Sequence, residues 1–117
     1  MNLKLAAVTF DCDDAAALAG FWSDLLGVPV DSGANAEMAS IGQEHSTKGP
    51  AIFFLQVPDK TPGKNAVHLD LAAKDWTAQI DRAVDLGAKR MGDFDEAGFV
   101  WTTLADPEGN LFDIARG

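Results

Sequence analysis

The sequence predicts an α+β fold in which two βαβββ modules form a curved mixed sheet with a cleft. The same order of strand-like and helix-like segments occurs twice along the chain, and each helix-like segment ends in a Leu-Gly pair. A shift of 61 residues aligns Ala7 with His68 and Asp14 with Asp75. In such a module a helix covers one face of the sheet and leaves the other face free for binding.

The first module is expected to contain strands at 3–11, 28–32, 37–42 and 50–57 and a helix at 14–26. Apolar residues of the helical segment recur at helical spacing, which places them on one face. They are Leu18, Phe21, Trp22, Leu25 and Leu26. Asp13 or Asp14 is the expected N-cap, and Gly27 is the expected residue after the last turn.

The second module is expected to contain strands at 66–73, 88–93, 98–105 and 111–116. Its helix follows Asp75, the expected N-cap, and ends at Leu86-Gly87. The apolar stripe of this helix consists of Trp76, Ile80, Ala83 and Val84. Residues 92–98 are acidic and read as a hairpin tip.

The chain of 117 residues has the length of one domain with its own core. We therefore predict a single domain over 1–117, with module one at about 1–58, a linker at 59–65 and module two at about 66–117.

Composition excludes several classes of function. Lys and Arg total 9 against 18 Asp and Glu, so the formal net charge is −9 and binding to nucleic-acid phosphates is not expected. A basic amphipathic stripe and an apolar run of about 20 residues are both missing from the sequence, so no membrane contact is expected. The single cysteine and the lack of a secretory pattern favour a cytoplasmic protein. The acidity favours solubility, with attraction of a cationic ligand as the alternative.

The segment DPEGNLFDI at 106–114 combines a turn with a short strand. The Pro-Glu-Gly-Asn sequence favours the turn, because proline presets φ and Gly and Asn tolerate positive φ. In the strand, Asp113 points away from the face that Phe112 and Ile114 share. This carboxylate is either a solvated surface group or part of the lining of a concave site.

Three segments resemble the vicinal oxygen chelate superfamily, which includes glyoxalase I, extradiol dioxygenases and bleomycin-resistance proteins. They are FWSDLLG at 21–27, FFLQVPDKTPGKNAVHLDL at 53–71 and WTTLADPEGNLFDI at 101–114. Their order and spacing resemble the small glyoxalase-like branch over essentially the whole chain. The resemblance implies a cleft built from both modules, and a homodimer, since short members often complete the cleft between chains.

The resemblance also implies a metal site with four ligand positions, on the first and last strands of each module. Carried over to this sequence, they fall on Ala7, Gln56, His68 and Asp113. Ala7 has no lone pair, and Gln56 offers only a neutral amide oxygen. Asp113 is one methylene shorter than the glutamate usual at its position. A catalytic zinc site typically has three good protein ligands, and this set offers fewer. We therefore expect no firmly held metal and leave weak binding of a divalent metal open.

His68 and Asp113 are the candidate catalytic residues, and a hydrogen-bonded interior histidine is the alternative for His68. In a cleft without metal, His68 would act as a general acid–base or as a polar anchor for a ligand. A hydrogen bond from an imidazole N–H of His68 to the Asp113 carboxylate across the cleft would raise the basicity of the imidazole.

Aromatic residues on strands supply candidate walls for the ligand. Phe54 shares a face with Gln56 by strand alternation, and Trp101 shares one with Phe99. Phe54 and Trp101 are therefore predicted as walls of a small-molecule pocket. The predicted ligand-binding set is Gln56, His68, Asp113, Phe54 and Trp101.

The leading hypothesis is a protein that binds a small organic molecule at a degenerate metal site, as the drug-sequestering or metabolite-sequestering relatives do. The alternative is a metal-dependent lyase, isomerase or dioxygenase acting on a substrate with vicinal oxygens. A third hypothesis is an interaction module whose purpose is dimerisation.

Overall fold

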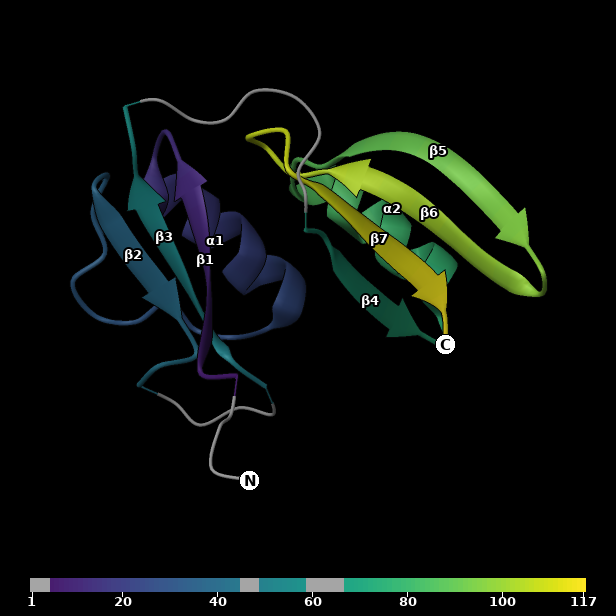
Figure 1. Cartoon of the computed structure of the whole chain (residues 1–117), viewed down its shortest axis with the longest axis horizontal. Helices are drawn as coiled ribbons and strands as arrows, with labels where there is room; N and C mark the ends of the chain where they lie inside the picture. Colours follow the sequence, from purple (N-terminus) through teal and green to yellow (C-terminus); the bar gives the residue numbers. More distant parts are fainter. Residues whose placement is uncertain (1–4, 45–48, 59–66) are drawn as a thin grey trace. The chain divides into compact units, whose positions relative to one another are not determined.

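The computed structural model describes residues 5–44, 49–58 and 67–117, and the chain divides into two compact units, Met1–Thr61 and Pro62–Gly117 (Figure 1). The α+β class predicted from the sequence is confirmed, because the described residues form two helices and seven strands in two mixed sheets. The predicted linker at 59–65 lies outside the described residues. A cleft shared by the two modules stays a prediction.

The first unit contains β1 (Ala7–Cys12), α1 (Ala15–Leu26), β2 (Met38–Ile41) and β3 (Ala51–Gln56). Its strands lie in the order β1-β3-β2, with β1 parallel and β2 antiparallel to β3. The strand predicted at 28–32 is wrong, because this segment forms only a single bridge between Val30 and Ile41. Pro29 lies beside that bridge and has no N–H to donate to a ladder.

Helix α1 begins and ends where the sequence predicts. The Asp14 carboxylate accepts a hydrogen bond from the Ala17 amide at 3.2 Å, and Gly27 ends the helix with φ of 70°. The Trp22 side chain is fully buried beneath β1, where its ring meets Phe10 edge-on at 5.5 Å. Phe10 in turn contacts Phe54 at 5.5 Å, so these rings form the core between α1 and the sheet.

The second unit contains β4 (Leu69–Ala73), α2 (Trp76–Leu86), β5 (Lys89–Glu96), β6 (Phe99–Ala105) and β7 (Leu111–Arg116). The strands lie in the order β4-β7-β6-β5, with β4 parallel to β7 and the other pairs antiparallel. The hairpin tip predicted at 92–98 is shorter than expected, because β5 runs on to Glu96. Only Ala97 and Gly98 form the turn, and both have positive φ, as a tight two-residue hairpin requires.

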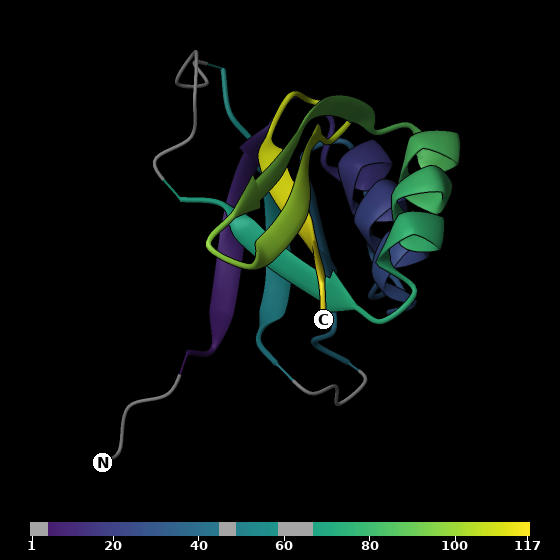
Figure 2. The same ribbon diagram turned by 90° about the vertical axis from the view of Figure 1, so that its right-hand side faces the viewer.

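Helix α2 packs on β7 and β4, and Figure 2 shows it lying along one face of this sheet. Its side chains Ile80 and Ala83 are buried, whereas Val84 is 42% exposed although the predicted stripe includes it. The Asp75 carboxylate accepts from the Gln79 side chain at 3.0 Å and does not cap the helix backbone. Neither α1 nor α2 is long and apolar enough to cross a membrane.

The turn predicted at 106–110 is confirmed, and a buried carboxylate organises it. Asp106 accepts hydrogen bonds from the backbone amides of Glu108 and Asn110, both at 2.9 Å, and from the Asn110 side chain. Gly109 occupies the position with φ of 87°. The turn therefore sets the register in which β7 returns beside β6.

Candidate functional site

The face of the second unit's sheet opposite α2, called the open face below, carries the polar residues that the sequence singled out. Phe112 and Ile114 are buried against α2, so strand alternation turns Asp113 to the open face. The parallel pairing of β4 with β7 places Asp70 directly opposite Asp113. His68 lies two residues before Asp70, immediately ahead of β4, and therefore reaches the same side.

An imidazole nitrogen and two carboxylates meet on the open face. The Nε2 atom of His68 lies 3.4 Å from Oδ1 of Asp70 and 3.4 Å from Oδ2 of Asp113. Thr103, opposite Asp113 on β6, donates its hydroxyl to Oδ1 of Asp113 at 2.6 Å. This bond orients the Asp113 carboxylate so that its second oxygen faces His68.

A stacked aromatic pair forms the wall beside these polar groups. The rings of Phe94 and Trp101 lie 5.3 Å apart at an interplanar angle of 18°. A hollow of about 330 Å³, called the His68 hollow below, is lined by this pair together with His68, Thr103 and Asp113. A second hollow of about 340 Å³ also borders Trp101 and Asp113, so this tryptophan separates two concave regions of the open face.

A glycine keeps the His68 hollow open. Gly92 lies opposite Thr103 and follows a register shift in β5 between Arg90 and Gly92. Gly92 and Phe94 both line the hollow. A Cβ atom added to Gly92 would lie 3.4 Å from the Phe94 ring and would take up part of that space. The absence of a side chain here therefore leaves room for a ligand beside the aromatic wall.

Phe54 does not line a binding surface, and its prediction as a wall is wrong. Its side chain is 0% exposed and packs in the core beneath α1. Phe53 is the neighbour that faces away from the helix, because adjacent strand residues point to opposite sides. Two consecutive phenylalanines offer no alternation of apolar and polar residues, so the sequence did not distinguish them.

Gln56 does not occupy the position equivalent to Asp113. Asp113 pairs with Asp70, which lies two residues after His68. In the same way, Phe53 pairs with Thr9, which lies two residues after Ala7. The internal repeat therefore matches Phe53 with Asp113. Gln56 shares the helix-side face of β3, where its side-chain amide donates to the Asp13 carbonyl at 2.9 Å.

Sequence reasoning missed Asp70, Thr103, Phe94 and Gly92. The alternation in His68-Leu69-Asp70 could have placed Asp70 on the same side as His68. Nothing comparable indicated Thr103 or Phe94, whose roles depend on pairing between strands. Trp101, in contrast, lies on the open face as one wall of the His68 hollow.

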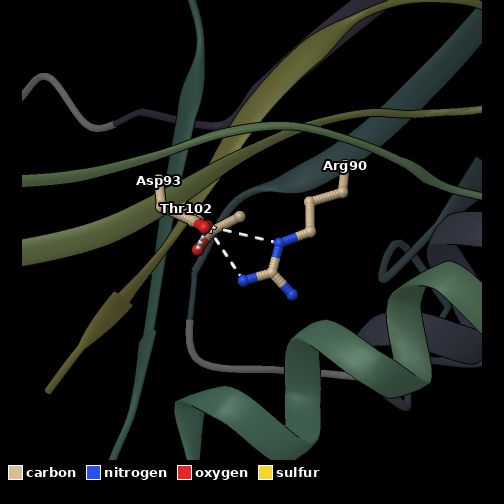
Figure 3. A network of polar contacts seen from close by, with 3 residues as sticks. All are labelled: Arg90, Asp93 and Thr102. Atoms are coloured by element: carbon tan, nitrogen blue, oxygen red, sulfur yellow. Dashed lines mark hydrogen bonds and ion pairs between the residues drawn. The ribbon is translucent and has the colours of Figure 1, made fainter.

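A separate polar network lies on the helix side of the same sheet (Figure 3). Thr102 donates to Oδ1 of Asp93 at 2.7 Å, and the Arg90 guanidinium contacts the same oxygen at 2.9 Å. The hydrogen bond from Thr102 and then that from Arg90 hold the pKa of Asp93 below its usual value. The carboxylate therefore stays ionised, and keeps its ion pair with Arg90, in more acidic solution than an unperturbed aspartate would.

The donor set of the open face fits a divalent metal, although only within the second unit. Candidate donor atoms of His68, Asp70 and Asp113 all lie within 4.8 Å of one another. Two ligand atoms that are each about 2.1 Å from one ion are roughly 3.0 to 3.4 Å apart. The distances from His68 Nε2 to the Asp70 and Asp113 carboxylate oxygens, both 3.4 Å, match this separation. The equivalent positions in the first unit, Ala7 and Phe53, offer no donor side chain.

The model of the glyoxalase-like domain family matches residues 7–115. Similar solved structures include a glyoxalase/bleomycin resistance protein/dioxygenase family enzyme from Burkholderia phytofirmans PsJN. That pair has 18% identity and a TM-score of 0.81, covering 97% of this chain and 98% of the other. The fosfomycin resistance protein FosX from Listeria monocytogenes has 13% identity and a TM-score of 0.77, with 100% and 95% covered.

A lactoylglutathione lyase from Agrobacterium tumefaciens has 15% identity and a TM-score of 0.67, with 97% of this chain and 93% of the other covered. At these identities the likeness concerns the fold alone. A comparison with curated proteins finds no significant match.

Proposed function

The chain belongs to the glyoxalase-like domain family, and from this premise we propose that it binds a small organic molecule on the open face of its second unit without needing a firmly held metal. The observation that carries this proposal is the His68 hollow, in which an aromatic pair lies beside a polar group of His68, Thr103 and Asp113. Its volume of about 330 Å³ falls in the range of small-molecule sites.

The lining suggests how a ligand would be held. Phe94 and Trp101 offer apolar area to a flat or aliphatic part of the molecule. His68 and Asp113 supply a donor and an acceptor that orient its polar part. The proposed site draws on residues of the second unit alone, since the side-chain amide of Gln56 donates to the Asp13 carbonyl at 2.9 Å.

The first unit weakens the case for a tightly bound catalytic metal. At the two positions that repeat His68 and Asp113, it carries Ala7 and Phe53, neither of which has a lone pair to share. Binding of the drug-sequestering or metabolite-sequestering kind therefore remains the leading function. We further propose that the protein is a cytoplasmic homodimer. Light scattering that shows only monomer would contradict the dimer.

Trp101→Ala is expected to weaken ligand binding about 30-fold or more, because loss of a central aromatic contact costs roughly 2 kcal/mol of binding free energy. The probe is a compound found by a thermal-shift screen of metabolites and cationic drugs, and its affinity is measured by calorimetry. Trp76→Ala is the matched control, because Trp76 belongs to α2 and lines neither hollow of the open face. Equal affinity of the two variants would contradict the proposed site.

The second candidate function is a metal-dependent lyase, isomerase or dioxygenase, with His68 and Asp113 as catalytic residues. The nitrogen and carboxylate donors beside the His68 hollow favour it. A bound divalent ion would polarise vicinal oxygens of a substrate. Elemental analysis of protein purified without chelators discriminates the two functions, since stoichiometric retained Zn, Ni, Mn or Fe supports the enzyme and contradicts binding without a firmly held metal.

A further inference from the structure

The helix side of the second unit's sheet has a hollow of its own. It measures about 290 Å³, is called the α2 hollow below, and lies between the first turns of α2 and the strands β5 and β6. Its lining combines apolar side chains with charged ones, chiefly Trp76, Ile80, Val100, Asp81, Arg90 and Asp93. We propose that the α2 hollow binds a small zwitterion with an apolar side chain, such as a free α-amino acid. The inference goes beyond the proposed function, which concerns the opposite face of the sheet.

A β-bulge turns two charged side chains of β5 toward α2. Arg90 pairs with Leu104, and Asp93, three residues later, pairs with Thr102. Both partners are buried, so Arg90 and Asp93 face the helix side together. On a regular strand, side chains three residues apart would point to opposite faces. The register shift between Arg90 and Gly92 inserts one residue and removes this alternation.

Stability alone does not account for this arrangement. The side chains of Arg90 and Asp93 are 49% and 63% exposed, and an ion pair in contact with water adds little to the stability of a fold. Bulges often redirect a side chain beside a functional site. The bulge in β5 therefore fits a binding role for the pair better than a structural one.

The pair keeps both donors and an acceptor for a ligand. Oδ1 of Asp93 accepts from Nε of Arg90 at 3.3 Å, from its Nη2 at 2.9 Å and from the Thr102 hydroxyl at 2.7 Å. A guanidinium has five N–H donors, so three of Arg90 have no partner among the residues that the structure describes. Within the same residues, Oδ2 of Asp93 accepts no hydrogen bond. Figure 3 shows the guanidinium extending toward α2, which supplies the other wall of the hollow.

Charge selects the class of ligand. Asp81 and Asp93 outnumber Arg90, so the lining has a negative formal charge and disfavours a simple anion. A simple cation would leave the remaining donors of Arg90 unused. A zwitterion suits both signs, because its carboxylate accepts from Arg90 and its ammonium group faces the carboxylates.

Size and apolar lining restrict the ligand further. The volume of about 290 Å³ lies at the lower end of small-molecule sites, which suits a molecule as small as an amino acid. Ile80 is 1% exposed and forms an apolar floor, bordered by half-buried Trp76 and Val100. An aromatic or branched side chain would lose contact with water against these three residues.

Titration of the full chain with L-phenylalanine tests the inference, with NMR shifts of backbone amides as the measurement because they detect weak binding. Phenethylamine lacks the carboxylate of this probe, and 3-phenylpropanoate lacks its ammonium group. We expect saturable shifts at Trp76, Arg90 and Thr102 with L-phenylalanine. Each analogue should bind at least about tenfold more weakly, because it loses a charge-assisted hydrogen bond.

Arg90→Gln and Asp93→Asn should each weaken binding of L-phenylalanine at least about tenfold, for the same reason. Arg82→Gln is the matched control, since it removes the same charge from α2 and Arg82 does not line the hollow. Equal affinities of Arg90→Gln and Arg82→Gln would overturn the site, as would a wild type that shows no saturable shifts. Phenethylamine that binds as tightly as L-phenylalanine would overturn the assignment to a zwitterion.

The outcome is separable from the function proposed for the open face. A loss of L-phenylalanine binding in His68→Ala but not in Arg90→Gln would place the probe in the His68 hollow and contradict the inference. Binding that His68→Ala leaves unchanged and Arg90→Gln weakens supports the α2 hollow, whatever the open face binds.

Discussion

Replacing Phe54 with alanine is expected to lower the free energy of unfolding of the first unit by about 3–5 kcal/mol, as truncation of a fully buried phenylalanine does. The ring is 0% exposed, and its contact with Phe10 connects it to Trp22 on α1. Its loss would leave a cavity at the centre of this core, which the surrounding side chains can fill only in part. Urea denaturation followed by tryptophan fluorescence measures the change, since Trp22 lies in the same core.

Phe53→Ala is the matched control for this experiment. Phe53 is the adjacent residue of the same strand, but it is only half-buried and points away from α1. Its truncation should cost clearly less stability. A Phe54→Ala protein with nearly wild-type stability but lost ligand affinity would instead favour a role for Phe54 in binding.

Replacing Asp106 with alanine is expected to lower the free energy of unfolding of the second unit by about 2–4 kcal/mol, because hydrogen bonds to a buried charged acceptor would be lost together. The carboxylate is 4% exposed and accepts from the amides of Glu108 and Asn110 and from the Asn110 side chain. Without it, these donors lose their partner in a place where water reaches them poorly.

The effect should extend to the open face. The turn at 106–110 joins β6 to β7, whose pairing places Thr103 opposite Asp113. Urea denaturation measures the stability, and amide chemical shifts of Thr103 and Asp113 report the register. Asp106→Asn keeps one acceptor oxygen and should lose less, whereas identical stability of Asp106→Ala and the wild type would refute the role of this carboxylate.

Local signals in the sequence identified most of the second unit correctly. Proline, glycine and asparagine marked the turn at 106–110, and Leu-Gly pairs marked the ends of both helices. Alternation between Phe112, Asp113 and Ile114 was enough to turn the carboxylate away from the core. These predictions succeeded because each depends on backbone preferences and side-chain directions within a few residues.

The first unit shows where such reasoning ends. Phe53 and Phe54 are identical neighbours, and only the packing of α1 decides which of them is buried. The prediction that Gln56 is the first-module equivalent of Asp113 is wrong for a related reason. The register of β1 and β3 makes Phe53 the equivalent residue. The pattern of apolar residues contains no information on that register.

By itself the sequence determined the α+β class, the two helices with their ends, the turn before β7 and the orientation of Asp113. Only the tertiary structure decided that Asp70 and Thr103 flank Asp113, that Phe94 stacks on Trp101 and that Phe54 belongs to the core. The reason is physical. Turns and caps are set by neighbouring residues, whereas a shared site depends on the register of strands far apart in the chain and on the face that a helix covers.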